Sequence, residues 1–123
     1  MRKLKFRWYD DSRNIMCYPE KIYNNCYTEK EHLMEFSGIY DRTGQEIFEG
    51  DILKKESGVN DTFGHQISWH IVEFRNSGFV PMCYKMLRNE YPKMPVYDSF
   101  YLIEEKAVGY EIIGNIYENP DII

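Results

Sequence analysis

Alanine and leucine, the two leading helix formers, are scarce in this chain. Its 123 residues hold one alanine, Ala107, and five leucines. Isoleucine and the aromatic residues take their place, with thirteen isoleucines and twenty aromatics, eleven of them tyrosine. These side chains suit the pleated, half-buried surface of a sheet. The composition therefore disfavours a helical bundle and predicts a mainly β protein.

An excess of basic residues and long apolar runs are also missing. The net charge is −5, which argues against a generally basic nucleic-acid-binding surface. No apolar run approaches the roughly 20 residues that a membrane helix needs, and no hydrophobic stretch follows the basic N-terminus as it would in a signal peptide. We expect a cytoplasmic protein, and the length predicts one domain over residues 1–123.

Cysteine is too sparse and too widely spaced to predict a metal site. The three cysteines are Cys17, Cys26 and Cys83, whereas a structural zinc site needs closely paired ligands. Free thiols in a reducing compartment are the simpler interpretation. We therefore expect neither a metal nor a cofactor.

Alternating polarity and turn residues predict about seven or eight short strands. In residues 3–9, Leu4, Phe6 and Trp8 share one face, and the cations share the other with Tyr9. We expect the rings of this strand to enter the core and its cations to face water. Further strands are expected at 15–18, 33–40, 46–55, 65–74, 79–84, 100–104 and 110–117, with single helical turns at 29–33 and 85–90.

The segment 33–55 carries the clearest local signal, a hairpin. Asp41 caps the predicted turn through its side chain, and Gly44 supplies the left-handed position. Gly50-Asp51 then interrupts the return strand where its apolar phase changes, which indicates a bulge or bend. Such a bend lets one strand serve two sheets. The predicted fold is a small bent barrel or a sandwich-like sheet with minor helical turns.

Basic and aromatic residues alternate on the first strand, as on surfaces that bind single-stranded nucleic acid. Lys3, Lys5 and Arg7 would contact phosphates in that interpretation. Because the rings lie on the opposite face from the cations, a solvated strand face that protects a sheet edge is the favoured alternative.

A small enzyme is the weakest hypothesis, with Asp51, His70 and Glu73 as the residues to test. No complete set of acid, base and nucleophile stands at a readable spacing. Asp51 is more simply explained by hydrogen bonds to the backbone at the bulge. Ser68 and His70, two positions apart on a strand, point the same way, but neither an oxyanion hole nor an orienting acid is visible.

Three segments of the chain form a recognisable combination: KFRWYDD at 5–11, LMEFSGIYDRTGQEIFEGDIL at 33–53 and EIIGNIYENPDII at 111–123. Together they resemble the YopX family of small phage and prophage proteins. The resemblance implies a mainly β fold with a bent, barrel-like sheet, and it defines no catalytic residue. Physical chemistry assigns structural roles to the motif residues, which are Asp41, Gly44, Gly50, Asp51, Gly114, Asn115, Asn119 and Pro120.

The leading functional hypothesis is a non-catalytic phage accessory protein that binds a host or phage protein. Abundant tyrosine and isoleucine and the unmatched region 56–108 favour such a binding role. Self-association is also expected, because the last strand offers an edge and the chain ends in the apolar pair Ile122-Ile123. Nucleic-acid binding through the first strand is the alternative.

Overall fold

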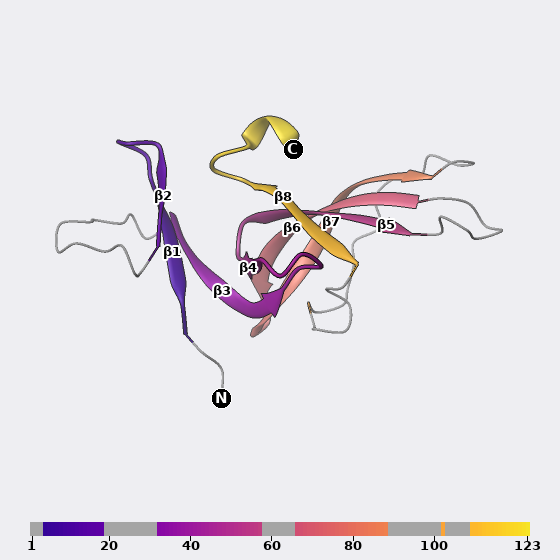
Figure 1. Cartoon of the computed structure of the whole chain (residues 1–123), viewed down its shortest axis with the longest axis horizontal. Coiled ribbons are helices and arrows are strands. Elements are labelled where there is room, and N and C mark those ends of the chain that lie inside the picture. The colour runs from indigo at the N-terminus through magenta and orange to yellow at the C-terminus, as the bar shows by residue number, and fades with distance from the viewer. Residues whose placement is uncertain (1–3, 19–31, 58–65, 89–101, 103–108) are drawn as a thin grey trace.

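The computed structural model describes residues 4–18, 32–57, 66–88, 102 and 109–123. Eight strands in these ranges form two four-stranded antiparallel sheets, one of them a half-barrel, which confirms the predicted mainly β fold (Figure 1). No helix in the described ranges is long and apolar enough to cross a membrane. The elements are β1 (Phe6–Asp10), β2 (Ile15–Cys17), β3 (Leu33–Tyr40), β4 (Glu46–Phe48), β5 (Asp51–Ser57), β6 (Gln66–Arg75), β7 (Gly78–Arg88), β8 (Tyr110–Asn115) and a 3-10 turn, η3 (Pro120–Ile122).

Each sheet is built from one contiguous half of the sequence. The strand order is β2-β1-β3-β4 in the first sheet and β7-β6-β5-β8 in the second. Figure 1 shows β1 and β2 at one end of the molecule, with β3 running from them toward the second sheet. The chain therefore passes from the first sheet to the second between β4 and β5, and β4 and β8 are edge strands of their sheets.

The passage between the sheets takes place at Glu49 and Gly50. The amide of Glu49 donates to the carbonyl of Glu35 on β3 at 2.9 Å, and the amide of Gly50 donates to Val72 on β6 at 2.8 Å. Gly50 has a φ of +87°, a conformation that glycine adopts without steric cost. The predicted bend at Gly50, which lets one strand serve two sheets, is confirmed.

The hydrophobic core lies mainly against the second sheet. Ile47 of β4 is fully buried there, so the first sheet contributes directly to the core of the second. Leu102 is bound to the same sheet, because its amide donates to the carbonyl of Phe79 at 2.7 Å. The core cluster consists of Ile47, Leu53, Val72, Phe79, Leu102 and Tyr110.

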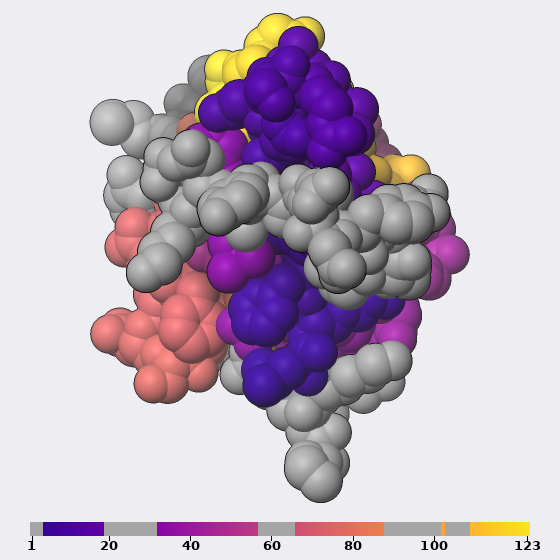
Figure 2. Space-filling model, turned by 90° about the vertical axis from the view of Figure 1, so that its left-hand side faces the viewer, coloured from indigo at the N-terminus to yellow at the C-terminus, as the bar shows by residue number. Residues whose placement is uncertain are grey.

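The C-terminal segment packs back onto the first sheet. The ring of Tyr117 stacks against Tyr9 of β1, with centroids 5.4 Å apart, and against His32 at 5.0 Å. Figure 2 shows the C-terminal turn in yellow next to the indigo β1–β2 hairpin. These stacks hold the segment after β8 in place, which matters because this segment forms one wall of the cleft described below.

The positions of most predicted strands are confirmed, but the helical turn at 85–90 is wrong over its described part. β7 continues to Arg88 because β6 pairs with it along its whole length, from Arg75 opposite Gly78 to Gln66 opposite Arg88. A shift in register at Trp69 and His70 absorbs one extra residue of β7. Of the helical turn predicted at 29–33, residues 29–31 lie outside the described residues and Leu33 begins β3. Of the strand predicted at 100–104, the structure describes only Leu102, which is not part of a strand.

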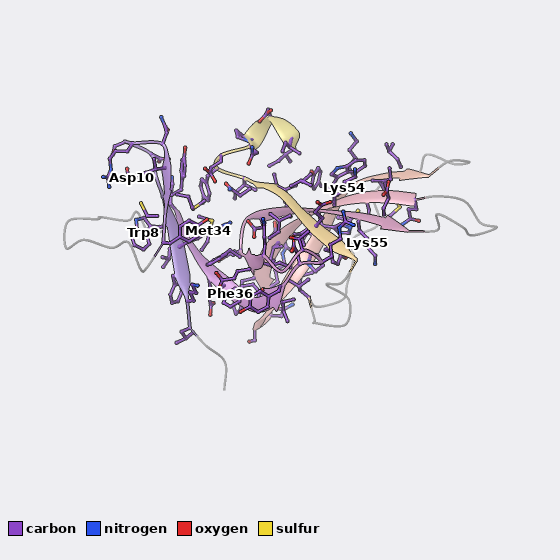
Figure 3. The ribbon with its side chains drawn as sticks, viewed as in Figure 1. Trp8, Asp10, Met34, Phe36, Lys54 and Lys55 are labelled. Atoms are coloured by element: carbon purple, nitrogen blue, oxygen red, sulfur yellow. The ribbon has the colours of Figure 1, made fainter. Side chains whose placement is uncertain are left out.

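The predicted inward face of the strand at 3–9 is partly wrong. Arg7, expected to face water, is 5% exposed, whereas Leu4, on the face expected to be buried, is 71% exposed. Trp8 is buried as expected, but on the opposite face of β1 from Arg7. Figure 3 shows Trp8 on the side of β1 away from the second sheet and Met34 on the side toward it. Arg7 is opposite Met34 in the register, so its side chain shares the inward face.

Candidate functional site

A cleft of about 540 Å³ opens between the edge strands β4 and β8. Its volume lies in the range of roughly 300–1,000 Å³ typical of ligand-binding pockets. Residues of both sheets and of the C-terminal segment line it together. The lining residues are Arg7, Tyr18, Gly44, Gln45, Glu46, Phe48, Asp51, Ile112, Gly114, Asn115, Glu118 and Asn119.

A buried ion pair forms part of the lining. Nη2 of Arg7 lies 2.6 Å from Oδ1 of Asp51, and the two side chains are 6% and 2% exposed. The guanidinium also stacks on the ring of Phe48, 4.6 Å from its centroid. Asp51 accepts a second hydrogen bond, of 2.8 Å, from the amide of Phe48. The hypothesis of a backbone role for Asp51 thus describes one of its two bonds and misses Arg7.

The environment of Asp51 affects its ionisation in two opposing ways. Burial raises the pKa of the Asp51 carboxyl, because the charged form is poorly solvated there. The Arg7 guanidinium and the Phe48 amide favour the carboxylate and offset part of that rise. The pair therefore satisfies a charge that would otherwise be costly to bury.

Two of the three basic residues predicted for nucleic-acid binding, Lys5 and Arg7, are not free cations on a solvated face. Nζ of Lys5 contacts both carboxylate oxygens of Glu46, at 2.8 and 2.9 Å. Arg7 is buried against Asp51, and Lys3 lies outside the described residues. The expectation that Lys5 and Arg7 point into water is wrong, because Lys5 pairs with Glu46 on β4 and Arg7 pairs with Asp51 on β5. Their pairing within the chain counts against a nucleic-acid interface on β1.

Side chains cap backbone amides along both edges of the cleft. On β4, Asp51 accepts from the amide of Phe48. On β8, Oδ2 of Asp41 accepts from Ile112 at 3.0 Å, and Oδ1 of Asn119 accepts from Asn115 at 3.1 Å. Unpaired donors on an edge strand invite pairing with another strand. These caps occupy the amide donors of Phe48, Ile112 and Asn115, which are then not available for pairing with another strand. The strands β4 and β8 belong to different sheets and border the open cleft.

Asp41 organises the turn that precedes β4. Its Oδ1 accepts from the amide and hydroxyl of Thr43, at 2.8 and 2.7 Å, and from the amide of Gln45 at 2.9 Å. Burial alone would raise the pKa of Asp41, but these bonds and the one from Ile112 outweigh it and lower the pKa. Gly44 follows with a φ of +89°, the left-handed conformation that the predicted turn requires.

Gly114 and Asn119 fit closely together in the C-terminal wall. A Cβ atom on Gly114 would lie 2.6 Å from Oδ1 of Asn119, which is closer than a Cβ atom comes to a non-bonded atom in folded proteins. The structural role expected for Gly114 is therefore close packing against a side chain. Pro120 begins η3 directly afterwards. This packing places Asn119 where it caps β8 and lines the cleft.

Asn115 orients the carboxylate of Glu118, which lies in the C-terminal wall of the cleft. Its Oδ1 accepts from the amides of Tyr117 and Glu118, at 3.1 and 2.8 Å. Its Nδ2 donates to Oε1 of Glu118 at 2.7 Å. The expectation of self-association through β8 stays a prediction, and the caps described above occupy the Ile112 and Asn115 amides of this strand. Of the apolar C-terminal pair, Ile123 remains 53% exposed.

The three residues of the enzyme hypothesis lie in three different places. Asp51 lines the cleft, and Glu73 lines a separate cavity of about 130 Å³. His70 is buried, with Nε2 2.8 Å from Oγ of Ser68 and its ring edge-to-face with Tyr110. Ser68 and His70 do point the same way, but they do so inside the protein, at 3% and 4% exposure.

Cys17 and Cys83 are buried thiols, and Cys26 lies outside the described residues. Among the residues described, no group of three or more His, Cys, Asp or Glu side chains could hold a metal ion.

Sequence reasoning missed six members of the site, which are Tyr18, Gln45, Glu46, Phe48, Ile112 and Glu118. None of the six forms a chemical motif by itself. Glu118 follows Asn115 by three positions. This spacing lets the Asn115 side chain hydrogen-bond both the backbone amide and the carboxylate of Glu118. Only the folding back of the C-terminal segment brings that pair to the cleft.

A family model described as YopX protein matches residues 3–123 of the chain. The chain belongs to the YopX protein family. Every residue that lines the cleft except Tyr18 lies in one of the three segments that carry the YopX resemblance, 5–11, 33–53 and 111–123. These segments, far apart in the sequence, therefore meet at one place in this YopX-family structure.

This YopX-family chain is similar in fold to the crystal structure of protein EF1440 from Enterococcus faecalis. The TM-score is 0.58 at 20% sequence identity, and the similarity covers 99% of each chain. At this identity the likeness shows the fold alone. No curated protein matches the chain significantly.

Proposed function

We propose that this YopX-family chain is a non-catalytic accessory protein of a phage or prophage. In this proposal it acts in the cytoplasm of the bacterial host and binds a host or phage protein in the cleft between β4 and β8. The phage setting is supported by the family resemblance, and the binding role by the architecture of the cleft.

The observation that carries the proposal is that the cleft is open while its buried charges, those of Arg7 and Asp51, already offset each other. Arg7 and Asp51 neutralise each other, and side chains cap the Phe48 and Ile112 amides. A general acid or base must exchange a proton with substrate, whereas Asp51 is engaged by two donors and is 2% exposed. Such a lining favours recognition of a surface over acid–base chemistry.

Affinity capture from phage-infected or prophage-carrying cells tests the proposal with one blocking variant and one control. Gln45 is exposed at the cleft, so Gln45→Trp places a bulky ring there with little cost to folding. Phe74→Trp is the control, since it introduces tryptophan at an exposed position outside the lining. Phe74 lies on β6 and is 44% exposed. We expect a protein captured by the unaltered chain and by Phe74→Trp to be lost with Gln45→Trp.

Two results would contradict the proposal. One is a partner retained equally by both variants, which would place the interface elsewhere. The other is capture of no protein above background by the unaltered chain. Circular dichroism of Gln45→Trp, compared with the unaltered chain, excludes misfolding as the cause of lost binding.

A further inference from the structure

The lining of the cleft is unbalanced in charge. Three of its side chains are carboxylates, Glu46, Asp51 and Glu118, and Arg7 is its cation. Arg7 offsets Asp51 at 2.6 Å, and Lys5, just outside the lining, offsets Glu46 at 2.8 Å. Glu118 is left, because no cation among the described residues pairs with it.

Glu118 is held in a defined position despite its exposure. Nδ2 of Asn115 donates to Oε1 of Glu118 at 2.7 Å, and Oδ1 of Asn115 accepts from the Glu118 amide at 2.8 Å. Asn115 itself is 6% exposed. A carboxylate oriented in advance loses less conformational entropy when it binds an opposite charge. The second oxygen, Oε2, is left for a donor from outside.

An aromatic wall lies in the same cleft. The ring of Tyr18 meets Phe48 edge-to-face, with centroids 6.2 Å apart, and both residues line the cleft. Aromatic faces bind ammonium and guanidinium groups and pack against the aliphatic stems of lysine and arginine. Arg7 already stacks on Phe48 in this way. The cleft thus combines an aromatic wall with the oriented carboxylate of Glu118, for which the described residues supply no cation.

We infer that the cleft takes a basic segment of the protein partner, with a lysine or arginine side chain reaching Glu118. The inference rests on the proposed function, and it adds the chemistry of the partner. The charge of −5 on the whole chain favours the approach of such a segment. An acidic segment would meet three carboxylates and an Arg7 whose charge Asp51 already offsets.

Nuclear magnetic resonance titration of the full chain tests the inference with two defined probes. One is a nine-residue glycine–serine peptide with three arginines, and the other has three glutamates at the same positions. Gly44 and Gly114 report from the cleft, and Gly38 and Gly78 report from other parts of the chain. We expect the arginine peptide to shift the Gly44 and Gly114 amide resonances most and the glutamate peptide to leave them unchanged.

Two variants, each lacking one negative charge, distinguish a specific contact with Glu118 from general electrostatic attraction to the chain. Glu118→Gln should weaken binding of the arginine peptide about two- to fivefold, the size of loss expected when an exposed ion pair is removed. Asp121→Asn, three residues away and outside the lining, should leave binding nearly unchanged. Equal effects of the two variants, shifts centred outside the cleft, or equal binding of the glutamate peptide would overturn the inference.

Failure of this inference and failure of the proposed function give different results. A partner that is lost with Gln45→Trp but binds through an acidic or neutral segment overturns only the inference. Binding of the arginine peptide at Gly44 and Gly114, with no protein captured from cells, contradicts only the proposed function.

Discussion

The guanidinium of Arg7, on β1, lies 2.6 Å from the carboxylate of Asp51, on β5. The first strand of one sheet is thereby tied to the first strand of the other, and the ion pair lies at the cleft that both sheets line. Because both side chains are almost fully buried, each charge depends on the other for its compensation.

Removal of either partner should be strongly destabilising. We expect Arg7→Met and Asp51→Asn each to lower the free energy of unfolding by about 3–5 kcal/mol, because each leaves a buried charge unpaired. The double variant should lose clearly less than the sum of the two. Lys5→Met is the control, since the pair of Lys5 with Glu46 is partly exposed and should contribute at most about 1 kcal/mol.

Urea denaturation followed by tryptophan fluorescence measures these differences. Additive losses in the double variant would show that Arg7 and Asp51 act independently. A loss in Lys5→Met as large as that in Arg7→Met would show that burial of the pair does not matter.

Glu49 should make stability depend on pH. Burial raises its pKa, a backbone hydrogen bond from Glu35 opposes that rise, and the charges of Glu35 and Glu73 add to it. The folded chain therefore holds this proton more tightly than the unfolded chain. The favourable contribution of the neutral Glu49 to folding stability is fully present below about pH 4.5, the ordinary pKa of this side chain. It is lost as the pH rises through the pKa that Glu49 has in the folded chain.

Glu49→Gln keeps this position neutral at every pH. We expect the variant to melt at a higher temperature than the unaltered chain at pH 7, with the difference vanishing below about pH 4.5. Thermal melts at several pH values check this. A difference that is constant with pH, or a destabilised variant at pH 7, would contradict the assigned environment of Glu49.

Gly50 should tolerate alanine less well than Gly44 does. Both have positive φ, +87° and +89°, so a side chain at either position costs roughly 1–2 kcal/mol in backbone strain. At Gly44 a Cβ atom meets nothing within 4 Å, whereas at Gly50 it would lie 3.2 Å from Sδ of the buried Met34. Chemical denaturation of Gly44→Ala and Gly50→Ala should show the larger loss at Gly50. Equal losses would mean that Met34 moves aside freely.

Gly114 and Asn119 should be energetically coupled. Gly114→Ala drives a Cβ atom to within 2.6 Å of Oδ1 of Asn119, and we expect it to displace the cap on the Asn115 amide. In an Asn119→Gly background that clash is gone, so Gly114→Ala should cost less there than in the unaltered chain. A double-mutant cycle in urea measures the difference. The same cost in both backgrounds would argue against the close packing.

The segment 33–55 could be predicted in detail because its signals are local. Asp41 and Gly44 have the turn chemistry that their positions require, and Gly50 stands where the apolar phase changes. Local backbone preferences and the polarity of neighbouring residues are sufficient to predict such features. The passage of the chain between two sheets at Gly50 follows from the same information.

The buried polar groups could not be predicted in this way. Polarity patterns place Arg7 in water, because such a pattern carries no information about a partner far away in the sequence. Arg7 is compensated by Asp51, 44 positions later, and His70 by Ser68 within the core. The cleft depends on the same long-range contacts, so its lining emerged only from the folded chain.

Site-specific photocrosslinking tests the central claim, that a partner protein binds between β4 and β8, most directly. Benzoylphenylalanine at Tyr18 or Gln45, both in the cleft, should crosslink to the same cellular protein. At Phe74 or Leu87, which are 44% and 46% exposed outside the lining, it should crosslink weakly or not at all. Strong crosslinks at Phe74 or Leu87 with none at Tyr18 and Gln45 would contradict the account.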